Sequence, residues 1–195
     1  MAAAAMPLPN VNAREEADMD TATPTAPGIT GHVQFDPPQF AHLGMRPELV
    51  VNPVEDERIW VELEPNVWFR PLFFDMNNGS HGEVLRVKRG GILSRHKHST
   101  PVHGFVIKGE WRYLEHSWVA RAGGYVMEPP GEIHTLTVDN DDEMQTVFII
   151  QGPTLYLDEA DRVVLIEDNF HLIETAAKHY EKVGLGADFV KQFIR

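Results

Sequence analysis

The sequence of 195 residues contains no cysteine. This absence excludes disulfide frameworks, thiolate zinc sites, iron–sulfur clusters and cysteine nucleophiles. Any metal must therefore be held by histidine and carboxylate side chains.

Long apolar runs and a basic leader segment are also missing. No stretch approaches the ~18 apolar residues that a transmembrane helix requires. The opening MAAAAMPLPNVNAREEADMD has neither a basic flank nor a sustained apolar segment, so no secretory signal is expected. Together with the lack of cysteine, this favours a cytoplasmic protein that does not enter a membrane.

Basic residues are scarce. The chain has 17 Lys and Arg against 29 Asp and Glu, for a formal net charge of −12. Nucleic acids and anionic membranes require clustered Lys and Arg, so we expect neither as a partner. Hydrophobic residues make up 43% of the chain, which suits one domain with a sizeable core.

Three segments differ in composition. Residues 1–28 are rich in Ala, Pro, Thr and Asp and are expected to form a flexible N-terminal arm. Residues 29–168 contain short Val-, Ile-, Phe- and Trp-rich runs separated by turn residues, among them VWFRPLFF, GEVLRVK, GFVIKGEWRYLEH and MQTVFIIQG. This rhythm predicts an all-β barrel or sandwich.

Residues 169–195 are expected to form a helical C-terminal extension. After Asp168 and Asn169, which can cap a helix, the segment FHLIETAAKHYEKVG has helical periodicity and ends before Gly184. Its apolar face comprises Leu172, Ile173, Ala176, Ala177 and Tyr180. The last residues, ADFVKQFIR, predict a second short helix.

The histidines carry the clearest chemical signal. His96 and His98 flank Lys97 in a segment expected to be extended, so both imidazoles point to the same face. His134 opens another strand after the turn at Pro129–Gly131. Three such histidines can occupy one triangular face of a metal and leave the opposite face open.

The glycines and prolines around these histidines extend the pattern. Gly90, the His96/His98 pair and Gly109 form one block, and Gly123, residues 129–131 and His134 form a second. These two blocks resemble the motifs of the cupin superfamily over residues 82–150. The resemblance implies a jelly-roll β-barrel, here with a short helical C-terminal extension. Val102 and His103 stand where that family usually has a glutamate ligand, and Val138 stands in place of a usual asparagine.

A narrower resemblance lies in GFVIKGEWRYLEHSW, GGYVMEPPGEIHTL and the C-terminal tail. These segments are similar to the 2,4'-dihydroxyacetophenone dioxygenase group of cupins. The resemblance implies one non-haem Fe(II) per subunit, held by His96, His98 and His134, with O2 as co-substrate. It implies C–C cleavage of a small aromatic α-hydroxyketone to 4-hydroxybenzoate and formate.

Other functions fit the same histidines. A three-histidine cupin could cleave a β-diketone or another enolisable carbonyl, and a zinc or nickel cupin could be an isomerase or hydrolase. A metal-binding sensor cupin without turnover is a further alternative. Zinc binds imidazole well, so the expectation of iron rests on the family resemblance.

Further residues are candidates for supporting roles. His103 and Glu128 are candidates for moving a proton or holding an imidazole, although strand alternation turns His103 away if Val102 faces the metal. The candidates for a substrate pocket are Phe105, Trp111, Tyr113 and Met127, with packing in the barrel core as the alternative. We expect a homodimer or homotetramer, because barrels of this size associate through edge strands and terminal arms.

Overall fold

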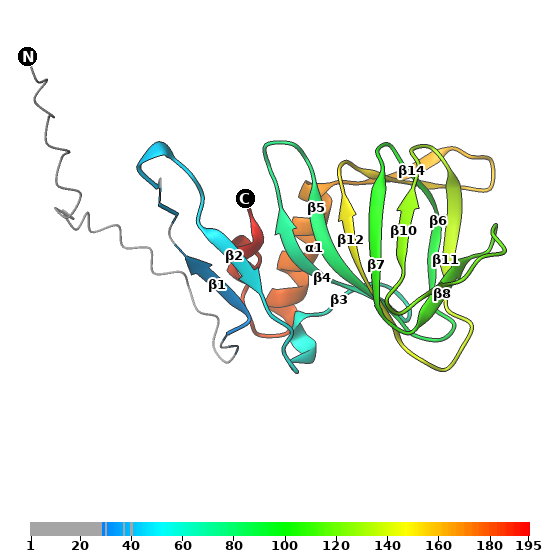
Figure 1. Cartoon of the computed structure of the whole chain (residues 1–195), viewed down its shortest axis with the longest axis horizontal. Helices are drawn as coiled ribbons and strands as arrows, with labels where there is room; N and C mark the ends of the chain where they lie inside the picture. The colour runs from blue at the N-terminus through cyan, green and yellow to red at the C-terminus, as the bar shows by residue number, and fades with distance from the viewer. Residues whose placement is uncertain (1–28, 30, 37, 40) are drawn as a thin grey trace, which may run out of the picture.

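The computed structural model describes residues 29, 31–36, 38–39 and 41–195. The expected N-terminal arm, residues 1–28, lies outside this part of the chain. The described residues form mainly antiparallel β-structure followed by an α-helix (Figure 1). The all-β expectation with a helical C-terminal extension is therefore confirmed.

Two six-stranded antiparallel sheets face each other and form the barrel. The first has the order β10-β7-β12-β5-β4-β3 and the second β14-β13-β6-β11-β8-β9. In chain order the first sheet comprises β3 (Val61–Glu64), β4 (Val67–Phe74), β5 (His81–Val87), β7 (Val102–Lys108), β10 (Tyr125–Glu128) and β12 (Met144–Ile150). The second comprises β6 (Ile92–His98), β8 (Glu110–Tyr113), β9 (Ala120–Arg121), β11 (Ile133–Thr137), β13 (Thr154–Leu157) and β14 (Val163–Glu167).

Alternation along the strands builds two cores. All seven residues of β5 are buried, because its two faces pack against different parts of the molecule. Leu85 belongs to the core inside the barrel, whereas Val84 belongs to a second core under the C-terminal helices. Residues that share the Leu85 face, Glu83 among them, therefore point into the barrel.

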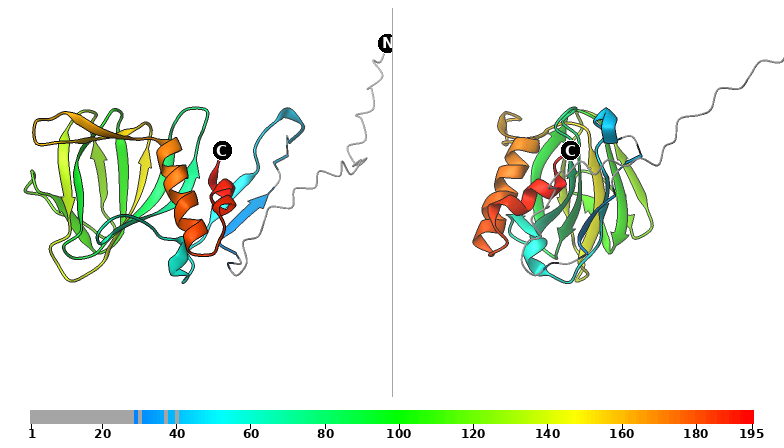
Figure 2. Two further views of the ribbon diagram at one scale, coloured as in Figure 1. Left: turned by 180° about the vertical axis from the view of Figure 1, so that it is seen from behind. Right: turned by 90° about the vertical axis from the view of Figure 1, so that its left-hand side faces the viewer.

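The second core is closed by α1 (Asn169–Lys182) and the 3-10 helix η3 (Ala187–Phe193) (Figure 2). Asp168 caps α1 by accepting a hydrogen bond from the His171 backbone N–H at 2.9 Å, as its sequence position predicts. Gly184 follows the helix with a φ of 79°, which favours glycine. Both expected C-terminal helices are confirmed, the second as a 3-10 helix.

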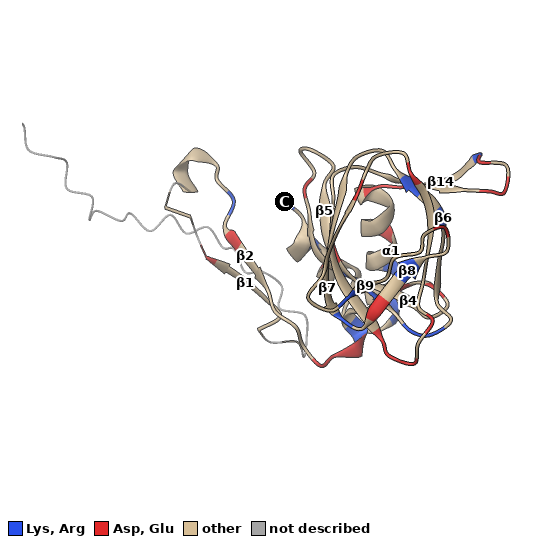
Figure 3. Cartoon of the chain, turned by 45° about the vertical axis from the view of Figure 1, so that its right-hand side comes forward, with Lys and Arg blue, Asp and Glu red and all other residues tan. Residues whose placement is uncertain are grey.

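Two hairpins were not expected from the sequence. β1 (Val33–Asp36) and β2 (Glu48–Val51) pair as a separate two-stranded sheet that stands beside the barrel (Figure 1). β13 and β14 form the other hairpin, and β14 lies at the edge of its sheet. Between 37% and 64% of each of its four apolar residues, 163–166, is exposed. Acidic residues of the 158–161 turn flank the strand (Figure 3).

The 3-10 helices η1 (Ala41–Leu43) and η2 (Glu57–Ile59) lie in the connections before the barrel. None of the helices in the described part of the chain is long and apolar enough to cross a membrane.

Candidate metal centre

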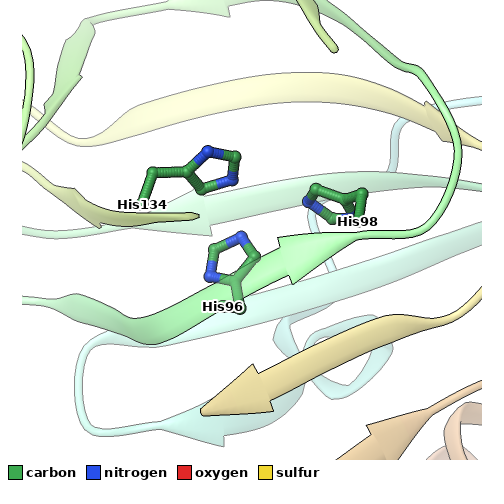
Figure 4. Close-up of side chains that lie close together, drawn as sticks. All are labelled: His96, His98 and His134. Carbon is green, nitrogen blue, oxygen red and sulfur yellow. The ribbon is translucent and has the colours of Figure 1, made fainter. Parts of the chain in front are cut away.

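Three buried histidines meet inside the barrel. His96 and His98 lie on β6, and His134 lies on the neighbouring strand β11, where it is paired with His96. One nitrogen from each ring lies within 4.8 Å of the others, and the rings point toward a common space (Figure 4). The structure thus brings together the three histidines that the sequence predicts as metal ligands.

Neighbouring groups fix the orientation of these rings. Nδ1 of His96 lies 2.7 Å from the carbonyl oxygen of Ser94. A carbonyl oxygen only accepts, so Nδ1 donates and Nε2 keeps its lone pair for a metal. The His134 ring stacks on Tyr113 at a centroid distance of 4.0 Å and an angle of 6°. The hydrogen bond from Nδ1 of His96 to a backbone carbonyl is of the kind that orients histidines in metal centres.

Burial keeps the three rings neutral. It lowers the pKa of His96 to about 4. Burial and then the neighbouring histidines lower the pKa of His98 to about 2 and that of His134 to about 3. Metal binding requires unprotonated imidazole, and Nε2 of His134 is buried without a hydrogen-bond partner among the described residues. The residues therefore fit a divalent transition metal.

Glu128 lies directly beside the histidines. Only 4% of this residue is exposed. Its Oε2 is 3.3 Å from Nε2 of His98 and 3.5 Å from Nε2 of His134. The Tyr113 hydroxyl donates a hydrogen bond to Oε1, whereas Oε2 has no hydrogen-bond partner in the described part of the chain. Burial raises the pKa of Glu128 to about 7, and a bound cation would favour its ionised form.

His103 and Phe105 lie away from this cluster. Val102 is buried toward the barrel interior, so alternation places His103 on the outer face of β7. There its Nδ1 lies 2.8 Å from the Tyr125 hydroxyl. Phe105 is 48% exposed and lines neither of the two cavities described below.

The other pocket candidates have different surroundings. Trp111 is 1% exposed and packs against Tyr113, Trp118 and Phe148, so it belongs to the barrel core. Tyr113 borders the histidine cluster. Met127, which is 52% exposed, lines a neighbouring hollow.

The main cavity comprises about 400 Å³ of empty space when its open mouth is counted. Its apolar wall comprises Leu63, Leu85, Leu93, Val102, Leu136, Phe148 and Ile150. Its polar wall comprises Glu83, His96, His98, Tyr113, Glu128, Thr154, Tyr156 and Glu167. The hollow that Met127 lines holds about 340 Å³ on the same measure, shares Tyr113 and Glu128, and reaches His134.

Glu83 and Glu167 are cavity residues that sequence reasoning missed. Glu83 is 7% exposed and Glu167 is 8% exposed. One signal in the sequence could have identified Glu83. It lies two residues before Leu85 in a strand, so both side chains point to the same face of the sheet. No spacing connects Glu83 with Glu167, because they lie on different sheets.

These acids give an expected pH dependence of stability. Burial, and then the nearby Glu167, raises the pKa of Glu83 from 4.5 to about 8. Between these values the folded state binds more protons than the unfolded state, so this contribution to stability is lost as the pH rises. Because leucine does not ionise, replacing Glu83 by Leu should remove this loss of stability at higher pH. We expect the metal-free Glu83→Leu variant to gain stability relative to the wild type between pH 5 and pH 8, measured by urea unfolding.

The exposed Glu62 on β3, which does not line the cavity, offers the matched control Glu62→Leu, and this variant should not reproduce the gain of Glu83→Leu. The other titratable groups coupled electrostatically to the acid pair are Tyr156 and Glu64. If the difference in the free energy of unfolding between the wild type and Glu83→Leu is the same at every pH in this range, the expectation is contradicted.

Comparison with known families identifies the fold. Residues 48–155, more than half of the chain, match the ChrR cupin-like domain family. The chain belongs to the ChrR cupin-like family. This membership confirms the resemblance to the cupin superfamily that the two histidine motifs indicated. No curated protein matches the sequence of this ChrR-like cupin.

Solved structures share the same barrel. An RmlC-like cupin protein from Ralstonia eutropha JMP134 is 28% identical, with a TM-score of 0.58 over 63% of this chain and 82% of that one. An acetylacetone dioxygenase from Acinetobacter johnsonii is 16% identical, with a TM-score of 0.59 over 67% of this chain and 93% of that one. At that identity the second likeness concerns the fold of this ChrR-like cupin.

Proposed function

We propose that this cupin is a non-haem Fe(II) dioxygenase that cleaves the C–C bond of a small aromatic α-hydroxyketone with O2. The observation that carries the proposal is the cluster of three neutral, buried imidazoles beside the unpaired Oε2 of Glu128. Of these residues, His96, His98 and Glu128 line the main cavity. The sequence resemblance to the 2,4'-dihydroxyacetophenone dioxygenases supports the choice of substrate.

The histidines set the charge requirement of the site. His96, His98 and His134 contribute no negative charge, so a divalent cation held by them keeps a net positive charge even with an ionised Glu128 beside them. An anionic, chelating ligand is therefore favoured, and an α-hydroxyketone offers adjacent hydroxyl and carbonyl oxygens. Iron, when bound, supplies the redox chemistry with O2.

Glu128 acts as the proton acceptor. Its Oε2 is placed to accept the proton of the substrate hydroxyl, while the Tyr113 hydroxyl holds Oε1. The apolar wall of the cavity, with Leu85 and Phe148 among its residues, excludes water from the bound substrate. In the overall reaction one C–C bond breaks, and both atoms of O2 enter the products, an aryl carboxylic acid and formic acid.

A β-diketone is the second candidate substrate. The acetylacetone dioxygenase whose fold this chain shares is named for an enolisable diketone, which can also bind through two oxygens as an anion. The same acceptor, Glu128, would take its proton.

Oxygen uptake tests the proposal. Protein reconstituted anaerobically with Fe(II) should consume one O2 per molecule of added 2,4'-dihydroxyacetophenone and form equal amounts of 4-hydroxybenzoate and formate. The metal-free and Zn(II)-loaded proteins are the controls and should consume none. Absence of uptake by protein that retains its iron would exclude this substrate, and pentane-2,4-dione would then test the second candidate.

A further inference from the structure

A pair of buried acids lines the metal cavity on the side where β13 and β14 lie. Glu83 comes from β5 and Glu167 from the end of β14, so the two facing sheets contribute one each. The Tyr156 hydroxyl donates a long hydrogen bond of 3.4 Å to Oε1 of Glu167. No hydrogen bond or ion pair of the described residues involves the side chain of Glu83, although only 7% of the residue is exposed. Most buried polar groups have a hydrogen-bond partner, protein or water, so this carboxyl group is available to a molecule in the cavity.

The acid pair is separate from the Glu128 side of the cavity. In the second sheet, β13 and β14 lie on one side of β6, and β11 and β8 lie on the other. Tyr156 and Glu167 are therefore across the His96/His98 strand from Tyr113 and His134. The centroids of the Tyr156 and His96 rings are 5.5 Å apart. Tyr156 therefore lies between the histidine cluster and the acid pair.

The chemistry of the pair favours a neutral partner. No lysine or arginine is among the residues that line the cavity, so no side chain compensates two negative charges. Burial raises the pKa of Glu83 to about 8 and that of Glu167 to about 7. Protonated carboxyl groups both donate and accept hydrogen bonds. A hydroxyl group, which also does both, complements them.

We propose that Glu83 and Glu167, together with Tyr156, bind a hydroxyl group on the part of the substrate remote from the atoms held at the histidine cluster. The inference rests on the proposed function, because it assumes that the substrate occupies this cavity. A site that pairs buried polar groups with a hydroxyl discriminates strongly against the analogue that lacks it, since those groups are then left unpaired. The acid pair would thus select ring-hydroxylated ketones.

Binding of a matched pair of ketones tests this selection. Fe(II)-loaded protein is titrated under anaerobic conditions, where no turnover occurs, with 2,4'-dihydroxyacetophenone and with 2-hydroxyacetophenone, which lacks the ring hydroxyl. We expect the wild type to bind the first at least about tenfold more tightly. Glu83→Leu should bring the two dissociation constants within about twofold by weakening only the first ligand, because it removes the hydrogen-bonding group.

Two variants separate recognition from a structural effect. Glu83→Gln keeps a donor and an acceptor and should retain part of the selectivity, whereas Glu62→Leu, on the exposed face of β3, should retain all of it. Equal selectivity in the wild type and Glu83→Leu would overturn the inference while leaving the proposed function intact. If neither ketone binds, the proposed substrate class fails. In that case the dissociation constants of phenol and toluene, measured with the same variants, decide whether the acid pair binds a hydroxyl group.

Discussion

A His134→Ala variant is expected to lose metal affinity by at least about 100-fold. Removing a group that merely supports a metal ligand costs about 10- to 100-fold in affinity, and His134 is itself one of the three nitrogen donors. The two remaining imidazoles of β6 would form an incomplete site. Competition with a chromophoric chelator for Fe(II) or Zn(II) measures the loss without relying on activity.

His103→Ala is the matched control for this experiment. His103 lies on the outer face of β7 with the Tyr125 hydroxyl as its partner, so its removal should leave metal affinity unchanged. Equal affinity in His134→Ala and the wild type would show that the three-histidine cluster is not the metal centre. A similar loss of metal affinity in both variants would mean that a substitution on the outer face of β7 also disturbs the histidine cluster inside the barrel.

A Glu128→Gln variant should slow substrate turnover by about 10²- to 10⁴-fold, the usual contribution of a positioned proton acceptor. Glutamine preserves the size of the side chain and can still accept the hydrogen bond from Tyr113. It cannot take up the substrate proton at the position of Oε2. Steady-state oxygen uptake at saturating iron gives the rate, and iron content is measured in parallel.

Iron content distinguishes this role from simple metal binding. We expect Glu128→Gln to keep its iron, because the three histidines remain. The control Glu62→Gln changes an exposed acid of β3 that does not line the cavity, and it should turn over normally. Full activity in Glu128→Gln, or loss of iron as severe as in His134→Ala, would exclude Glu128 as the proton acceptor.

Local patterns in the sequence predict a large part of this molecule. The His96/His98 pair needs only the two-residue period of a strand to place both rings on one face, and α1 needs only its cap at Asp168 and its apolar periodicity. The position of the third candidate ligand, His134, depends on the pairing of β11 with β6. It could be connected with the pair only through the spacing of the cupin motifs.

Features that depend on packing between distant segments escaped prediction. Glu83 and Glu167 line the same cavity because two sheets face each other, and no period within either strand records that arrangement. Glu128 was a sequence candidate for moving a proton or holding an imidazole, but its burial was not predicted, because a charged residue at the end of a strand is usually exposed. Its burial follows from the contact with Tyr113 and the histidines, which only the closed barrel provides.

The edge strand β14 has a consequence for concentrated solutions of this protein. Its apolar residues are largely exposed, and an uncovered strand edge is a template for pairing with another copy. The net charge of −12 makes copies repel one another, but salt shortens the reach of that repulsion from about 10 Å at 0.1 M to about 3 Å at 1 M. We therefore expect high ionic strength to favour association along β14.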